Sequence, residues 1–219
     1  MYNAIMLIPP EVFQEEIGLP PEKRSLRIAF IGMSGAGKSM VSNYVSAHTK
    51  MKRIDIDGLI GERLARRLNR KRMDVYDVGK YLGMPYYKGF KYRERIYLDL
   101  EKKILAEEIL PNSIVDTTGS TIYHPTEMEK IRKNTLIIYL KESKEHRNKL
   151  FQRFLKRSKP ICWHGFYTKR GGESDKDSLE RSYRALLEDK HDRYVQVADI
   201  SISMHISRKD VLETTEASL

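Results

Sequence analysis

Residues 26–45 read LRIAFIGMSGAGKSMVSNYV, and this stretch decides the fold class of the chain. Its first six residues are mostly apolar and predict a short buried strand. Three glycines follow within six residues, and a helical pattern begins after Lys38. A strand, a glycine-rich turn and a helix in this order predict the first unit of an alternating α/β sheet.

The turn itself, GMSGAGKS over residues 32–39, matches the pattern G-x-x-x-x-G-K-[ST] of a phosphate-binding P-loop. Its glycines let the backbone curl until successive N–H groups face one spot, where phosphates bind beside the helix N-terminus. The lysine would reach the β- and γ-phosphates of ATP, and the serine hydroxyl would bind Mg²⁺. We therefore expect the nucleotide to contact Gly35, Ala36, Gly37, Lys38, Ser39 and Met40.

Four further runs have the length and the β-branched residues of buried strands, at 52–56, 113–117, 135–140 and 199–204. Longer helical patterns lie between them, at 93–110, 143–157 and 178–197. Strands that alternate with helices predict a parallel sheet covered on both faces. We therefore expect an α/β protein with a three-layer αβα P-loop NTPase fold, in which helices flank a five-stranded parallel sheet.

The 219 residues are expected to form one kinase domain over 26–219, preceded by an arm over 1–25 that contains four prolines. The arm lacks the basic start and long apolar run of a signal peptide or membrane anchor, so no membrane association is expected. The single cysteine, Cys162, allows no disulfide within the chain. This favours a reducing compartment, and we expect a cytoplasmic protein.

The formal net charge of +10 favours anionic partners such as nucleotides, phosphorylated metabolites or nucleic acid. A lysine-rich solvated surface would give the same balance. The basic run at 63–72 could touch RNA, but an exposed helix face is the commoner reason for such a run. Nucleic acid is therefore not the expected partner, and we expect a small-molecule acid substrate and a monomer or weak homodimer.

Two carboxylates, Asp55 and Asp57, stand at the end of the second predicted strand. Residues two apart in a strand point to the same side, so both would face one cleft. Asp55 could hold Mg²⁺ through water, and Asp57 could accept a hydrogen bond or a proton from a substrate hydroxyl. A solvated turn before Gly58 is the alternative.

The third predicted strand ends in Asp116, followed by the sequence TTGS over 117–120. Asp116 lies where P-loop enzymes often keep a carboxylate near Mg²⁺. Gly119 would let a substrate approach the backbone, and the Ser120 hydroxyl could bond to substrate oxygens. A helix N-cap made by these hydroxyls is the alternative, and both roles are compatible.

Several cations could act on the phosphoryl group. A polar, glycine-containing segment over 153–178 carries Arg153 and Lys159 and is expected to form a lid. Cations on a mobile segment can close on transferring charge and exclude water. Most such residues in any chain are solvated surface groups. Arg193, before the last strand, could also face the cleft.

These motifs resemble the shikimate kinase family, within the P-loop kinases that are similar to nucleoside monophosphate kinases, over about 26–205. The resemblance lies in GMSGAGKS, in IDIDGLIGE over 54–62, in Tyr92-Arg93 and in DRYVQVADISI over 192–202. It implies ATP-dependent phosphorylation with Asp57 on the substrate hydroxyl. It also implies that Arg93 and Arg193 clamp an acid group of the substrate.

The chain departs from the family on the substrate side. The family has three consecutive glycines where this chain has residues 118–120, TGS. The family lid carries Arg-Pro-Leu-Leu, where this chain has KPIC over 159–162. We expect Lys159 to be the catalytic lid cation, with the other lid cations, Arg153, Arg157, Lys169 and Arg170, as alternatives. The Gly-Glu that precedes Phe-Arg in the family is absent. The kinase interpretation is therefore firmer than the choice of shikimate as acceptor.

Three hypotheses follow. The leading one is an ATP- and Mg²⁺-dependent kinase that phosphorylates a hydroxyl of a small anionic metabolite, with shikimate the best single candidate. The second is a P-loop nucleotide-binding regulator that has lost this activity, which the altered glycine and lid motifs would explain. The third is a nucleic-acid-directed P-loop protein, which the net charge would explain.

Overall fold

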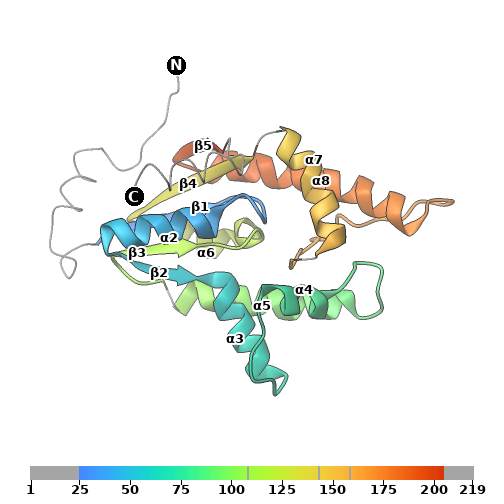
Figure 1. Cartoon of the computed structure of the whole chain (residues 1–219), viewed down its shortest axis with the longest axis horizontal. Coiled ribbons are helices and arrows are strands. Elements are labelled where there is room, and N and C mark those ends of the chain that lie inside the picture. The colour runs from blue at the N-terminus through green and yellow to red at the C-terminus, as the bar shows by residue number, and fades with distance from the viewer. Residues whose placement is uncertain (1–24, 108, 143, 158, 205–219) are drawn as a thin grey trace, which may run out of the picture.

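The computed structural model of the chain describes residues 25–107, 109–142, 144–157 and 159–204. Five strands form one parallel sheet in the order β2-β3-β1-β4-β5 (Figure 1). They are β1 (Arg27–Ile31), β2 (Lys52–Asp55), β3 (Ser113–Asp116), β4 (Thr135–Glu142) and β5 (Ile200–Met204). The predicted strands and the α/β fold class are confirmed. The predicted arm lies outside the described residues, apart from Ser25.

The helices cover both faces of the sheet. They are α2 (Lys38–Thr49), α3 (Ile56–Arg67), α4 (Val75–Leu82), α5 (Phe90–Glu107), α6 (Pro125–Arg132), α7 (Lys144–Lys156) and α8 (Asp175–Val197), with a 3₁₀ turn, η2 (Thr121–Tyr123). The three helices predicted from periodicity correspond to α5, α7 and α8. Among the described residues, no helix combines the length and the apolar character that a membrane crossing requires.

Alternating residues of the central strand β1 face two separate cores. Ile28 and Phe30 pack on the side of α2, with Val41 and Val45 against them. Ala29 and Ile31 belong to the larger core, which α3, α5, α6 and α8 build on the opposite face. A strand buried on both faces explains why its sequence is a continuous apolar run instead of an alternating one.

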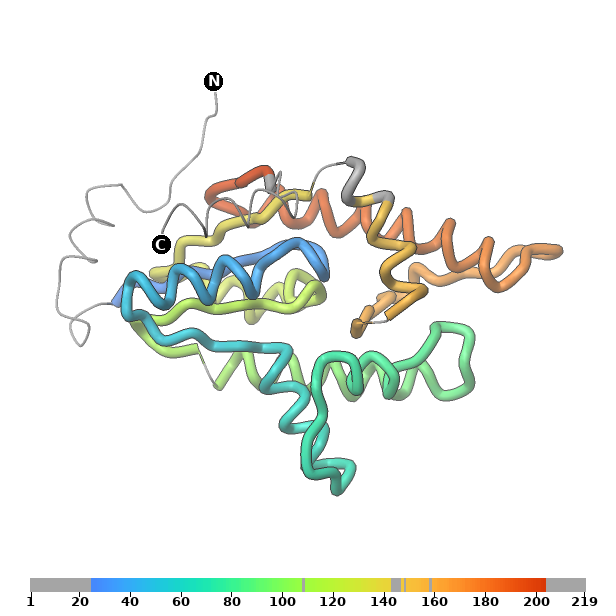
Figure 2. Tube along the Cα trace, in the orientation of Figure 1, coloured from blue at the N-terminus to red at the C-terminus, as the bar shows by residue number. Residues whose placement is uncertain are grey.

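The chain extends beyond the carboxyl ends of the strands on two sides. On one side α3, α4 and α5 pack together, and on the other α7 and the first part of α8 project from the sheet (Figure 1). The segment between α7 and α8 reaches back toward α4 (Figure 2). The Arg157 guanidinium lies 3.6 Å from the centre of the Tyr76 ring, so this segment touches α4.

One expectation about the second strand is wrong. Asp55 and Asp57 do not share a strand, because β2 ends at Asp55 and α3 begins at Ile56. The Asp55 carboxylate accepts a hydrogen bond from the Gly58 backbone N–H at 3.0 Å and caps the helix. An Asp is a strong N-cap, so the helix starts directly at the strand end. Asp57 consequently lies in the first turn of α3.

Gly61 makes the packing of α3 testable. A Cβ at this position would lie 2.5 Å from the Met73 carbonyl oxygen. Gly61→Ala should therefore lower the free energy of unfolding by about 1–3 kcal/mol, although alanine is the better helix former. Denaturant unfolding of Gly171→Ala is the control, because a Cβ at Gly171 meets nothing within 4 Å. Equal stability of the two variants would contradict the tight contact.

Candidate active site

The P-loop connects β1 to α2 through backbone that only glycine adopts readily. Gly32, Gly35 and Gly37 have φ angles of 145°, 87° and 93°. A Cβ at Gly32 would also lie 2.8 Å from the Leu140 carbonyl oxygen of β4. The three glycines are therefore required by conformation, and the first also by the close approach of β4.

The Lys38 side chain is curled back onto this loop. Its Nζ donates to the carbonyl oxygens of Gly32 and Met33 at 3.0 and 3.1 Å, and the residue is 7% exposed. Burial lowers the pKa of Lys38, while the charges of Asp116 and Asp57 act against that shift. Ser39 and Met40 lie exposed on the first turn of α2. The ammonium is thus held near the loop, with acidic side chains in range.

Asp57 lines a small, narrow space, here called the inner cavity. Its lining is Met33, Ser34, Asp57, Tyr97, Gly119, Ser120, Pro160, Ile161, Cys162, Tyr183, Leu186, Leu187 and Lys190. The Tyr97 hydroxyl donates to Asp57 Oδ1 at 3.3 Å. Burial raises the pKa of Asp57 to about 6, although the nearby Lys38 charge lowers it. This carboxylate is therefore more basic than an ordinary aspartate.

The inner cavity is too narrow in this structure for a metabolite. Its volume is about 20 Å³, which is room for little more than one water molecule. Pro160, Ile161 and Cys162 of the segment between α7 and α8 form one wall. That segment must move before a molecule of metabolite size can enter.

Lys190 of α8 is the residue that the sequence reasoning missed. It is 6% exposed and lines the inner cavity. Within the described part of the chain its ammonium has no hydrogen-bond or ion-pair partner. Burial lowers the pKa of Lys190 to about 8. The side chain is buried while its ammonium lines the cavity without a partner among the described residues, so this group is the strongest sign of an anionic ligand. The sequence did contain a signal for this residue, because its spacing from Tyr183 and Leu187 places all three side chains on the same face of a helix.

The two arginines expected to clamp an acid group do not line the inner cavity. The Arg93 guanidinium donates to the carbonyl oxygens of Leu82 and Lys88 at 3.0 and 3.1 Å and fastens the turn between α4 and α5. Arg193 donates to Asp189 at 2.7 Å and is 45% exposed. Both guanidinium groups therefore bind neighbouring residues outside the inner cavity.

Asp116 ends β3 and is 3% exposed, with Arg53 of β2 as its ion-pair partner. The same guanidinium lies 3.4 Å from Asp55 and donates to the Ser42 hydroxyl at 2.9 Å. Parallel pairing sets Asp55 directly beside Asp116, so both carboxylates share one edge. Arg53 supplies a positive charge between two of the three groups expected to hold Mg²⁺.

The residues present still fit a magnesium ion. Hydroxyl and carboxylate oxygens are the ligands that Mg²⁺ prefers, and it usually takes only one or two carboxylates besides phosphate oxygens and water. Asp55, whose side chain is 43% exposed, and the exposed Ser39 offer such oxygens. Asp116 is less available than Asp55, because Arg53 already neutralises it.

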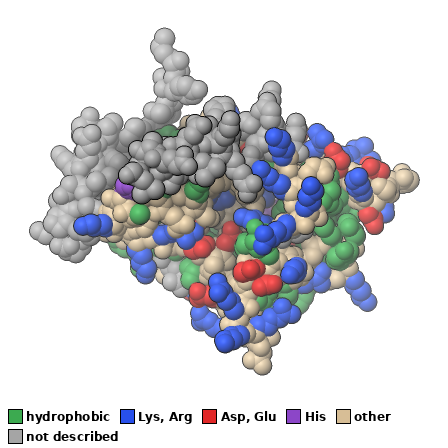
Figure 3. All heavy atoms as spheres, viewed as in Figure 1, with side chains coloured by type: hydrophobic (Ala, Val, Ile, Leu, Met, Phe, Trp, Pro, Cys, Tyr) green, Lys and Arg blue, Asp and Glu red, His purple; other side chains and the backbone are tan. Residues whose placement is uncertain are grey.

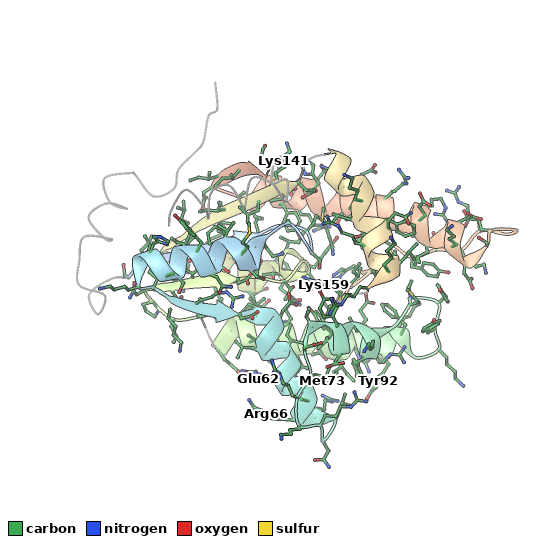
Figure 4. All side chains as sticks on the ribbon, in the orientation of Figure 1. Glu62, Arg66, Met73, Tyr92, Lys141 and Lys159 are labelled. Carbon is green, nitrogen blue, oxygen red and sulfur yellow. The ribbon has the colours of Figure 1, made fainter. Side chains whose placement is uncertain are left out.

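A second space, here called the lid cavity, adjoins the P-loop. It has a volume of about 340 Å³ and is lined by Ser34, Gly35, Tyr76, Leu150, Arg153, Phe154, Lys156, Arg157, Lys159, Ile161 and Tyr183. Four cations from α7 and the segment after it therefore surround one face of the P-loop. Lys159 lies between α7 and α4 (Figure 4). The structure thus brings Arg153 and Lys159 to the nucleotide side of the site.

The basic run at 63–72 is mostly exposed, but only its first half is a helix face, because α3 ends at Arg67 and residues 68–72 follow it as a turn and loop. Arg66 pairs with Glu62 one turn earlier at 3.5 Å, and Arg63 pairs with Glu107 at 3.0 Å. Figure 4 shows Glu62 and Arg66 on the outer part of α3. On the face in view, Lys and Arg side chains are spread over the surface with acidic residues among them (Figure 3).

The P-loop and the order of the sheet define a P-loop kinase. A family model described as shikimate kinase matches residues 58–217, which is more than half of the chain. The chain belongs to the shikimate kinase family. The match begins after the P-loop and Asp57 and includes β3, β4, β5 and the helices from α4 onward.

Individual relatives agree with the family. A shikimate kinase of Dehalococcoides mccartyi is 28% identical over 202 residues, which cover 90% of this chain and 95% of that protein. A shikimate kinase of Acinetobacter baumannii in complex with shikimate has a TM-score of 0.53 at 17% identity, over 91% of this chain and 98% of that one. The enzyme of Bacteroides thetaiotaomicron has a TM-score of 0.52 at 21% identity, over 81% and 86%. The two structures show the shared fold.

The pair of Arg53 and Asp116 allows a stability test. Arg53→Met would leave the buried Asp116 carboxylate without its cation and should lower the free energy of unfolding by about 3 kcal/mol. The double variant Arg53→Met, Asp116→Asn removes the buried charge as well and should recover part of the loss. Denaturant unfolding measures both. A double variant no more stable than Arg53→Met would show that charge burial is not the cause.

Proposed function

We propose that this protein is an ATP-dependent kinase that transfers the γ-phosphoryl group to a hydroxyl of a small anionic metabolite, with shikimate the best single candidate. The observation that carries the proposal is the inner cavity, where the unpaired Lys190 ammonium and the Asp57 carboxylate line one space beside the P-loop. Membership of the shikimate kinase family supports it. The relative named as a complex with shikimate supports the choice of acceptor.

The P-loop is proposed to hold the phosphates of ATP through the backbone N–H groups of Gly35–Met40. Lys38 would exchange its bonds to the carbonyls of Gly32 and Met33 for the β- and γ-phosphates. Ser39 and Asp55 would hold Mg²⁺, which neutralises phosphate charge when bound. Asp116 is proposed to contribute to this Mg²⁺ site indirectly, through its ion pair with Arg53.

Asp57 is proposed to orient and deprotonate the acceptor hydroxyl. Its raised pKa of about 6 leaves it ionised at neutral pH and still basic enough to accept a proton. Tyr97 holds one of its oxygens by a hydrogen bond, which fixes the direction of the carboxylate. Gly119 and Ser120 form the neighbouring wall, where the backbone can approach the acceptor.

Lys190 is proposed to bind the acid group of the acceptor, in the place that the family resemblance gave to Arg193. A carboxylate in the inner cavity would supply the missing counter-charge. Arg93 and Arg193 would then act at the cavity entrance only if they released their present partners.

The lid is proposed to supply the charge that stabilises the transferring phosphoryl group. Lys159 is the proposed catalytic cation and Arg153 the proposed nucleotide contact, since both line the lid cavity beside the P-loop. The small volume of the inner cavity, with Pro160, Ile161 and Cys162 in its wall, supports a lid that opens for entry of the acceptor. The single cysteine supports a cytoplasmic enzyme, and we infer a monomer or weak homodimer.

A regulator that binds nucleotide without turnover is the second candidate. The observation that favours it is the engagement of both Arg93 and Arg193 away from the inner cavity. An ADP-release assay with shikimate, gluconate and nucleoside monophosphates separates the two candidates. Acceptor-dependent ADP release supports the kinase. Tight ATP binding by calorimetry without release for any acceptor would favour the regulator.

The pKa of Asp57 predicts a pH profile. An aspartate with a pKa of about 6 loses its charge as the pH falls through that value, so kcat/KM should decline tenfold per pH unit below it. Above pH 7 this group should leave the rate unchanged. Asp57→Asn should lower kcat by at least about a hundredfold and abolish the acidic limb. A wild-type acidic limb centred near pH 4 would contradict the assignment.

The assignment of Lys190 predicts a contrast between two variants of α8. Lys190→Met should raise the KM of the acceptor about ten- to a hundredfold, because it removes a charge-assisted hydrogen bond. The KM of ATP should change less than about threefold. Arg193→Met is the matched control and should leave the KM of the acceptor within about threefold. The reverse pattern would return the acid-binding role to Arg193.

A further inference from the structure

Glu101 of α5 is a fully buried carboxylate in a knot of hydroxyl groups. It is 0% exposed. Its Oε1 accepts from the hydroxyls of Thr118 and Thr121, the second at 3.0 Å. Its Oε2 accepts from the Ser120 hydroxyl at 2.8 Å and faces His124 Nε2 at 3.0 Å. All four partners belong to the stretch that follows β3.

Burial of a carboxylate is costly, so the burial of Glu101 needs a physical explanation. Four partners around two oxygens satisfy the charge as completely as protein groups can. An apolar residue at position 101 would fill the core without this cost. Fully satisfied polar networks in cores fix one geometry among several, which apolar packing does less well.

The geometry that the knot fixes is that of residues 118–121. The Ser120 backbone N–H donates to Thr118 Oγ1 at 3.0 Å, inside the knot. The Gly119 carbonyl accepts from the Tyr194 hydroxyl at 3.0 Å, and the same hydroxyl lies 3.1 Å from the Gly32 carbonyl of the P-loop. This stretch is therefore tied to α5 on one side and to α8 and the P-loop on the other.

The fixed stretch lies against both the P-loop and Lys190 at the inner cavity. A Cβ at Gly119 would be 3.5 Å from the Ser34 backbone nitrogen and 3.8 Å from Lys190 Nζ. Gly119 and Ser120 line the inner cavity, whereas Glu101, Thr118 and Thr121 do not. A shift of this stretch would change its distance from both the P-loop and the Lys190 ammonium, and with it the shape of the inner cavity.

We propose that Glu101 is a positioning residue, which holds residues 118–121 so that the inner cavity places the acceptor between Asp57 and Lys190. This inference rests on the proposed function. Glu101 touches no reacting group and acts through the Thr118, Ser120 and Thr121 hydroxyls. Its negative charge also favours the ammonium form of Lys190, which strengthens the grip on an acid.

Glu101→Gln tests the proposal, because an amide of the same shape cannot accept from hydroxyls on both of its ends. The variant should raise the KM of shikimate, and its dissociation constant by calorimetry with ADP and Mg²⁺, about tenfold. The KM of ATP should stay within about twofold. Glu127→Gln is the matched control, a glutamate of α6 that is 5% exposed and does not line the inner cavity. It should change neither KM.

A stability effect alone would not give this split. If Glu101→Gln lowers the melting temperature but leaves the affinity for shikimate within twofold of wild type, the proposal is overturned. If Glu101→Gln does not fold, Thr121→Val removes one donor with little change of shape and should raise the KM of shikimate about threefold. An unchanged KM in that variant would also overturn it.

Failure of the proposed function has a different signature. Wild-type protein would then release no ADP and bind no shikimate, whatever residue stands at 101. Modification of Lys190 by trinitrobenzenesulfonate at pH 7, followed by mass spectrometry, tests Glu101 without an acceptor. Release of residues 118–121, which lie against the Lys190 ammonium, should expose the amine and make it react several times faster in Glu101→Gln than in wild type and Glu127→Gln. Equal rates would overturn the positioning role.

Discussion

The pairing of β1 with both β3 and β4 is the constraint on which the site depends. The register places Phe30 beside Asp116 and Ile31 beside Tyr139, so β1 and β3 end within one residue of each other, while β4 continues to Glu142. The P-loop leaves the middle strand there, with the stretch after β3 on one side and the Leu140 carbonyl on the other. Backbone hydrogen bonds set this arrangement, and the side chains of the site inherit their positions from it.

Charge balance is the second theme of the site. Lys38 and Lys190 bring two buried ammonium groups to the P-loop and the inner cavity, and only Lys38 has hydrogen-bond acceptors in the described structure. Asp116 forms an ion pair with Arg53. The Glu101 carboxylate is stabilised instead by hydrogen bonds from three hydroxyl groups and by its contact with His124. Asp57 keeps a raised pKa, because its burial outweighs the nearby lysine. The Lys190 ammonium and the basic Asp57 carboxylate together suit a substrate that carries both an acid group and a hydroxyl.

Two of the departures from the family motifs lie at the inner cavity. Where the family has three glycines after the third strand, this chain has Thr118-Gly119-Ser120, and their hydroxyls bond to Glu101. Glycines leave room for a ligand and keep the backbone flexible. Hydroxyl groups that bond to a buried carboxylate instead hold the backbone in one conformation. The lid is altered in parallel: Ile161 and Cys162 close the inner cavity, and Trp163 packs near Phe154 and Tyr183 in the core.

The sequence by itself determined the parallel sheet and the P-loop. Apolar runs of β-branched residues, helical periodicity and G-x-x-x-x-G-K-S are local patterns, and each predicts structure without knowledge of distant residues. Only the tertiary structure decided which cations enter the site. Lys190 and Arg193 are three residues apart on α8, and packing of that helix buries one and exposes the other. The pairs of Arg53 with Asp116 and of Glu101 with Ser120 join residues 63 and 19 positions apart. Such partners follow from strand register and helix packing, which no short stretch of sequence encodes.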